Sequence, residues 1–181
     1  LGQLAIRTEQ IEEVKAELEE KGLQTGDIIS ASRKREDGSL LEWKMLFIQQ
    51  SDEDCPFPFF IQWNQTDDER KHDLHQKGAL PADNLNVEIS KVHYVVKDVN
   101  KTVLKWRKYF DLPRGEETIS DEWRAKSCVI SLPSFQLSFT EATGDGIIQQ
   151  MLDKKGEGPY LVEFEPHVFK SYHHVYGGMY K

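Results

Sequence analysis

Residues 4–22 are Leu4-Ala-Ile-Arg-Thr-Glu-Gln-Ile-Glu-Glu-Val-Lys-Ala-Glu-Leu-Glu-Glu-Lys-Gly22. The short apolar run over 4–7 predicts a strand. Ile11, Val14 and Leu18 recur at helical spacing, which predicts an amphipathic helix over residues 10–21. Thr8 is the residue type that caps a helix start, and Gly22 is the type that ends one. A strand followed at once by a helix therefore opens the chain.

Three further strands are predicted after this helix. Residues 28–33 and 41–48 are β-prone and flank an Asp37-Gly38 turn, which predicts a hairpin. The prolines of Cys55-Pro-Phe-Pro then interrupt the chain, and residues 59–63 predict another strand. The order of elements is β, α, β, β, β.

The same order recurs 88 residues further on. Alternating apolar residues predict a strand over 87–97, and Asp98 can cap a helix over 100–110. Strands are expected near 116–119 and over 123–132 and 135–140. A shift of 88 residues places Ile11 on Val99 and Leu18 on Trp106, so the pattern repeats although few residues are identical.

These elements predict four parts of the chain. Residues 1–66 form a first βαβββ module, and residues 67–84 form a polar linker with a short helix. Residues 85–141 form a second βαβββ module. Residues 142–181 form a C-terminal helix and strand, which we interpret as the start of an incomplete third module.

Composition limits the classes of function. The 181 residues carry a formal charge of −8, which disfavours binding to nucleic-acid phosphates. No apolar run is long enough to span a membrane, and residues 1–5 do not resemble a signal peptide. The two cysteines, Cys55 and Cys128, are far apart and predict free thiols in a reducing compartment. We therefore expect a cytoplasmic protein.

The sequence resembles the glyoxalase-like domain proteins of bacteria, a branch of the vicinal oxygen chelate superfamily of glyoxalases, bleomycin-resistance proteins and extradiol dioxygenases. The resemblance rests on Ser32-Arg-Lys-Arg-Glu-Asp-Gly-Ser-Leu-Leu-Glu-Trp-Lys44, on Pro56-Phe-Pro-Phe-Phe-Ile-Gln-Trp-Asn64 and on Val92-His-Tyr-Val-Val-Lys-Asp-Val99. It implies an α+β fold of tandem βαβββ modules. Their mixed sheet forms a cup-shaped half-barrel with helices on the convex face.

The resemblance also implies where a metal would bind. Metal enzymes of the superfamily use a histidine on the first strand and a glutamate on the last strand of each module. The first-strand positions here are Gln3 and Lys91, and the last-strand positions are Gln62 and Gln136. Amides bind a cation weakly and an ammonium repels it, so we predict no metal and no cofactor. His93, two residues after Lys91 on the same face, is the alternative metal ligand.

Other polar and aromatic residues have two readings each. Arg33 can clamp an anion or is a surface charge, and Trp43 can line a ligand pocket or belongs to the core. Glu42 and Glu141 are acid–base candidates only if the fold places them inside the cup. His72 and His75 lack a third ligand in the sequence and are expected to be solvated. His173 and His174 have Glu163 and Glu165 upstream, but adjacent residues of an extended segment point apart, so no metal site is expected there either.

The leading prediction is a protein that binds a small molecule in the cup without a metal, with no catalytic residue assigned. The predicted ligand-binding residues are Gln3, Arg33, Trp43, Gln62, Lys91, His93 and Gln136. One alternative is a metal-dependent lyase, isomerase or dioxygenase, so the sequence leaves enzymatic activity open. Another is a structural or oligomerisation module, because proteins of this branch usually carry a further module before this one. A second copy could complete the cup as a homodimer.

Overall fold

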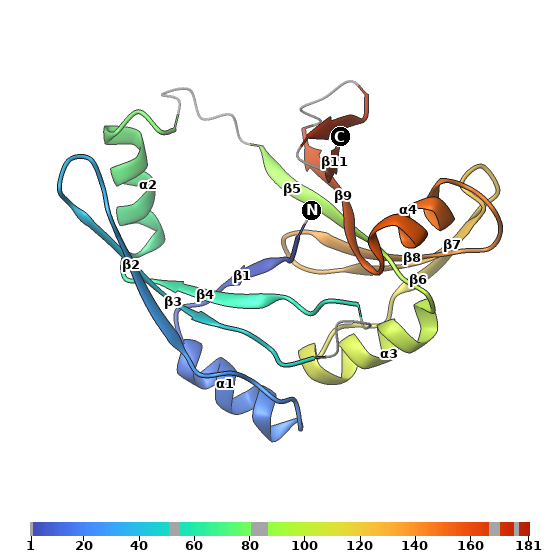
Figure 1. Cartoon of the computed structure of the whole chain (residues 1–181), viewed down its shortest axis with the longest axis horizontal. Coiled ribbons are helices and arrows are strands. Elements are labelled where there is room, and N and C mark those ends of the chain that lie inside the picture. Colours follow the sequence, from blue (N-terminus) through green and yellow to red (C-terminus); the bar gives the residue numbers. More distant parts are fainter. Residues whose placement is uncertain (1, 51–54, 81–86, 167–170, 176–177) are drawn as a thin grey trace. The chain divides into compact units, whose positions relative to one another are not determined.

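A computed structural model describes residues 2–50, 55–80, 87–166, 171–175 and 178–181 (Figure 1). The chain separates into two compact units, one of residues 5–49 and 58–86, the other of residues 1–4, 50–57 and 87–181. Each unit contains one mixed sheet. None of the described helices is long and apolar enough to cross a membrane.

The first unit contains a four-stranded sheet of order β1-β4-β3-β2. Its elements are β1 (Ala5–Arg7), α1 (Ile11–Glu20), β2 (Ile29–Lys34), β3 (Leu40–Leu46), β4 (Phe59–Trp63) and α2 (Asp67–Gln76). β1 pairs in parallel with β4, whereas the other two pairings are antiparallel. Each boundary lies within a few residues of its prediction, and the linker helix α2 carries a Thr66–Glu69 capping box.

Helix α1 covers one face of this sheet with the residues that its spacing predicted. Ile11 and Leu18 are buried, as are Leu46 and Phe60, which are register partners on β3 and β4. Gly22 follows the helix at φ +83°, the left-handed conformation expected of a terminating glycine. Thr8, however, is not the cap: the N-cap is Gln10, and the Thr8 hydroxyl accepts a hydrogen bond from the Gln10 N–H instead.

The second unit contains a seven-stranded sheet of order β10-β11-β9-β5-β8-β7-β6. Its elements are β5 (Glu88–Val95), α3 (Val99–Phe110), β6 (Glu116–Ser120), β7 (Ala125–Ser131), β8 (Gln136–Ala142), α4 (Ile147–Lys155), β9 (Gly158–Glu165), β10 (His173–Val175) and β11 (Gly178–Tyr180). β5 pairs in parallel with β8, so the order β5-β8-β7-β6 repeats that of the first unit. On its other side β5 pairs with β9, in antiparallel direction.

The two faces of the seven-stranded sheet differ in composition. Tyr94 and Phe139 face α3, where both rings pack against Trp106 at centroid distances of 5.3 and 4.9 Å. On the opposite face, Ile148 of α4 packs with Val95 and Leu161. α4 therefore covers only one part of that second face. We call the remainder, which α4 leaves uncovered, the open face.

The first N–H group of α1 and that of α3 each donate to a side chain on the last strand of the same module. The Gln62 side-chain oxygen accepts from the Ile11 N–H at 2.9 Å, and the Glu141 carboxylate accepts from the Val99 N–H at 2.8 Å. Each acceptor has a lysine as register partner on the neighbouring strand, Lys44 in one unit and Lys126 in the other. The repeat therefore extends to the capping of the helices.

The predicted α+β fold of two βαβββ modules is confirmed, in the form of two separate mixed sheets that are not closed into a barrel. Each module's helix lies on one face of its own sheet. The C-terminal elements add to the second sheet, with β9 beside β5, the first strand of the second module.

Removal of the Glu141 cap tests this repeat. We expect Glu141→Ala to lower the free energy of unfolding by about 1 kcal/mol, because the Val99 N–H loses its acceptor. Glu141→Gln restores an amide oxygen like that of Gln62 and is expected to lose less. Chemical denaturation followed by circular dichroism measures both. Equal losses in the two variants would contradict the capping role.

Candidate functional site

The open face of the seven-stranded sheet carries a cluster of polar side chains. Lys91 and His93 lie two residues apart on β5, so their side chains share one face of the strand. Their register partners on β8 are Gln136 and Ser138. Lys91, His93 and Ser138 line a cavity of about 220 Å³ on this face. Three of these four residues, all except Ser138, were predicted from the sequence as ligand-binding.

Glu163 on β9 completes the centre of this cavity. Its carboxylate lies 2.6 Å from Nε2 of His93. The Glu163 side chain is 21% exposed and the His93 side chain 14%. The hydrogen bond from His93 holds the pKa of Glu163 below its ordinary value of 4.5, and the positive charge of Lys91 acts in the same direction. Glu163 is therefore ionised at neutral pH and orients the imidazole ring. A histidine held in this way can accept a proton from a bound molecule.

Hydroxyl groups and aromatic rings form the walls of the cavity. The hydroxyls of Ser127 and Thr140 lie 2.9 Å apart in a hydrogen bond. Burial raises the pKa of the neighbouring Tyr160 to about 12, so this phenol stays protonated and can donate a hydrogen bond. The rings of Trp123 and Tyr172 also line the cavity and meet edge to face at 6.0 Å. These walls suit a small molecule that has both polar and apolar surface.

The donor set does not fit a resident metal ion. No group of three or more histidine, cysteine, aspartate or glutamate side chains gathers anywhere in the described part of the chain. The two candidate ligands in the cavity, His93 and Glu163, are hydrogen-bonded to each other. Their neighbour Lys91 carries a positive charge that opposes a bound cation. We therefore derive no chemistry through a metal.

The other predicted ligand-binding residues lie elsewhere. The Gln3 side chain donates to the backbone oxygen of Phe57, and the Gln62 side chain caps α1. Gln62 therefore reaches the face that α1 covers, and it also lines a cavity of the four-stranded sheet together with Trp43. Arg33 lies exposed on β2 as the register partner of Leu41.

Trp43 pairs with Trp63 on the opposite face of the four-stranded sheet. Their rings lie 5.6 Å apart, and the guanidinium of Arg70 on α2 lies 3.8 Å from the centre of the Trp63 ring. Cation–π stacking of this kind gives the pair a structural role, because Arg70 fixes α2 to the sheet. Both tryptophans nevertheless remain partly exposed, and both border a cavity of about 280 Å³.

Glu163 is the residue that sequence reasoning missed at this site. Its strand was predicted, but the carboxylate was weighed only against His173 and His174. The pairing of β9 with β5 brings it to His93 across 70 positions of sequence. Alternation within β9 indicates which residues share a face with Glu163, but it does not indicate which strand lies beside it. Glu141, the acid–base candidate from the sequence, lies on β8, and its carboxylate accepts a hydrogen bond from the first N–H group of α3.

Comparison with known proteins agrees with this fold. The family described as the glyoxalase-like domain matches residues 1–110. A hypothetical protein from Staphylococcus aureus has a similar structure, with a TM-score of 0.70 at 20% identity, over 98% of this chain and 64% of that one. A methylmalonyl-CoA epimerase from Mycobacterium tuberculosis gives a TM-score of 0.44 at 13% identity, over 51% of this chain and 84% of that one. A search of curated protein sequences gives no match.

The chain belongs to the glyoxalase-like domain family, as the resemblance in its sequence predicted. The family matches the whole first module and continues to the end of α3 in the second. The chain spans less than two thirds of the Staphylococcus aureus structure. At this level of identity the structural similarity describes the fold and not the activity.

The pKa of Glu163 predicts how stability depends on pH. Its folded-state pKa lies below the ordinary value of 4.5, so the ionised Glu163 carboxylate stabilises the fold above that pH, and this contribution is lost as the pH falls through the folded-state pKa. We expect Glu163→Gln to lower the free energy of unfolding by about 1–2 kcal/mol at pH 7. The difference from the unmodified protein should shrink below about pH 4.5.

Urea denaturation of both proteins between pH 3 and pH 7 measures this difference. Glu165→Gln, two residues further along the same strand, is the matched control and should change stability little, because Glu165 is exposed. A Glu163→Gln difference that stays constant over the whole pH range would contradict the assignment.

Proposed function

We propose that the chain binds a small hydroxy- or oxo-carboxylate on the open face of the seven-stranded sheet, without a metal ion. The observation that carries the proposal is the hydrogen-bonded His93–Glu163 pair inside a cavity lined by Lys91. The ammonium group of Lys91 suits a carboxylate, and the histidine suits a hydroxyl or carbonyl oxygen. Binding of this kind is the function that the polar lining supports best.

The size and walls of the cavity support a small ligand. Its volume of about 220 Å³ lies below the usual range of pockets for drug-sized molecules. Side-chain hydroxyls on the three neighbouring strands β6, β7 and β8 offer both donors and acceptors: Thr118, Ser120, Ser127, Ser138 and Thr140. Such a surface favours a molecule with several oxygen atoms over an apolar one.

A cytoplasmic location is part of the same proposal. Cys55 and Cys128 are both free and buried, which agrees with a reducing compartment. Small hydroxy- and oxo-acids are soluble metabolites, so a binding site for them needs no contact with a membrane.

Substitution of Lys91 tests the binding proposal. Saturation-transfer NMR with lactate, pyruvate, glycerate and tartrate as probes should detect at least one ligand of the unmodified protein. We expect Lys91→Gln to weaken that ligand about tenfold, because a charge-assisted hydrogen bond is lost. Lys71→Gln on the exposed face of α2 is the matched control and should bind as the unmodified protein does.

The proposal fails if no carboxylate probe binds, or if Lys91→Gln and Lys71→Gln bind equally well. Circular dichroism of each variant confirms that the fold is retained. Loss of binding in His93→Ala, together with retained folding, would place the ligand beside the histidine rather than elsewhere on the sheet.

Metal content distinguishes this proposal from a metal-dependent enzyme. We expect dialysed protein, incubated with Ni²⁺, Zn²⁺, Mn²⁺ or Fe²⁺ and desalted, to retain well below one equivalent of metal, because the ligand set is too small. Elemental analysis measures the bound metal. A near-stoichiometric ion that is lost in His93→Ala would contradict metal-free binding and favour a lyase, isomerase or dioxygenase.

A further inference from the structure

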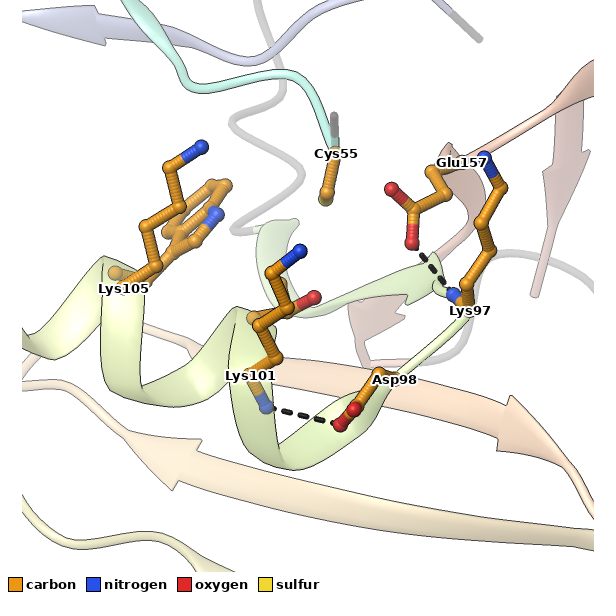
Figure 2. A pocket seen from close by; sticks show the side chains of 8 residues that line it. Cys55, Lys97, Asp98, Lys101, Lys105 and Glu157 are labelled. Carbon is orange, nitrogen blue, oxygen red and sulfur yellow. Dashed lines mark hydrogen bonds between the residues drawn. The ribbon is translucent and has the colours of Figure 1, made fainter. Parts of the chain in front are cut away.

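A second cavity lies at the start of α3, on the face of the seven-stranded sheet opposite the candidate site. Its volume is about 200 Å³ (Figure 2). Lys97, Lys101 and Lys105 follow one another at intervals of four residues and all line it. In Figure 2 the amino groups of Lys101 and Lys105 point to the side of the helix on which Cys55 lies.

Lys101 and Lys105 lie four residues apart on α3, and Lys97 lies immediately before its N-cap, Asp98. Like charges four residues apart repel each other on a helix surface. The N-terminal end of a helix also carries a partial positive charge, which disfavours nearby cations. Lys97 and Lys101 form no ion pair with any residue that the structure describes. An anion in the cavity would remove this repulsion.

The wall of the cavity also contains a buried donor without an acceptor. Trp106 is 2% exposed, and its Nε1–H forms no hydrogen bond within the described residues. Its ring is held by Phe57, Tyr94, Phe110 and Phe139, so it cannot turn toward another acceptor. A buried N–H of this kind is expected to meet a water molecule or a ligand.

Two carboxylates line the cavity but are used by the backbone. Asp98 accepts from the N–H of Lys101 as the helix cap, and Glu157 accepts from the N–H of Lys97 (Figure 2). Among the described residues of the lining, three ammonium groups stand against two carboxylates, which leaves one net positive charge.

We propose that this cavity, which we call the α3 pocket, binds a compact oxyanion, a phosphate or a carboxylate group, between Lys101, Lys105 and the indole N–H of Trp106. The ammonium groups supply charge and the indole supplies a directed hydrogen bond. The α3 pocket and the candidate site lie on opposite faces of the sheet, so the two proposals are independent.

Titration with inorganic phosphate, followed by ¹H–¹⁵N NMR, tests the α3 pocket. The chain has four tryptophans, and Trp106→Phe identifies the indole signal of Trp106. At constant ionic strength we expect this signal to shift and saturate, while those of Trp43 and Trp63 remain in place. Lys101→Gln with Lys105→Gln should weaken phosphate at least tenfold. Lys108→Gln, on the same helix outside the pocket, is the matched control and should not.

A parallel titration with acetate and citrate distinguishes a phosphate site from a carboxylate site. The anion class that binds with the lower dissociation constant is the one for which the α3 pocket is suited. The proposal is overturned if the Trp106 signal does not move, or if sodium chloride moves it equally. It is also overturned if the double lysine variant, folded by circular dichroism, titrates like the unmodified protein. Lys91→Gln should leave the phosphate titration unchanged. A failure of the binding proposal for the candidate site can therefore be distinguished from a failure of the proposal for the α3 pocket.

Discussion

The parallel pairing of the first and last strands in each module is the constraint on which the structure depends. Parallel strands cannot be joined by a tight turn, so the chain must cross over through a helix that covers one face of the sheet. The pairing also brings the end of the last strand to the start of that helix. Gln62 and Glu141 use this proximity to cap α1 and α3. The opposite face is left without that helix, and polar side chains can gather there.

The sequence predicts elements well where the signal is local. The spacing of Ile11 and Leu18 identified the buried stripe of α1, and Asp98 caps α3 as its residue type suggested. The internal shift of 88 residues places Ile11 on Val99, and both residues occupy the capped first position of their helices. The helical spacing and the Asp98 cap depend on residues within a few turns of one another, so neither sheet had to be known for them.

The candidate site could be predicted only in part, because it depends on pairing between distant strands. Lys91 and His93 share a face by simple alternation, and the sequence suffices for that. Gln62 and Gln136 were treated as equivalent positions on their last strands, but the equivalent of Gln62 is Glu141, which also caps a helix and pairs with a lysine. A shift of one residue along a strand exchanges its two faces, so the sequence alone does not decide which face a last-strand residue occupies.

The contribution of β9 explains how a carboxylate reaches the open face of the second module. β9 pairs with β5 on the side away from β8, and this places Glu163 against His93. The carboxylate occupies the imidazole nitrogen that a metal would otherwise need, while Lys91 adds a positive charge beside it. A site of this composition favours a ligand that carries its own negative charge. In the proposed binding mode, Lys91 supplies the positive charge that such a ligand needs.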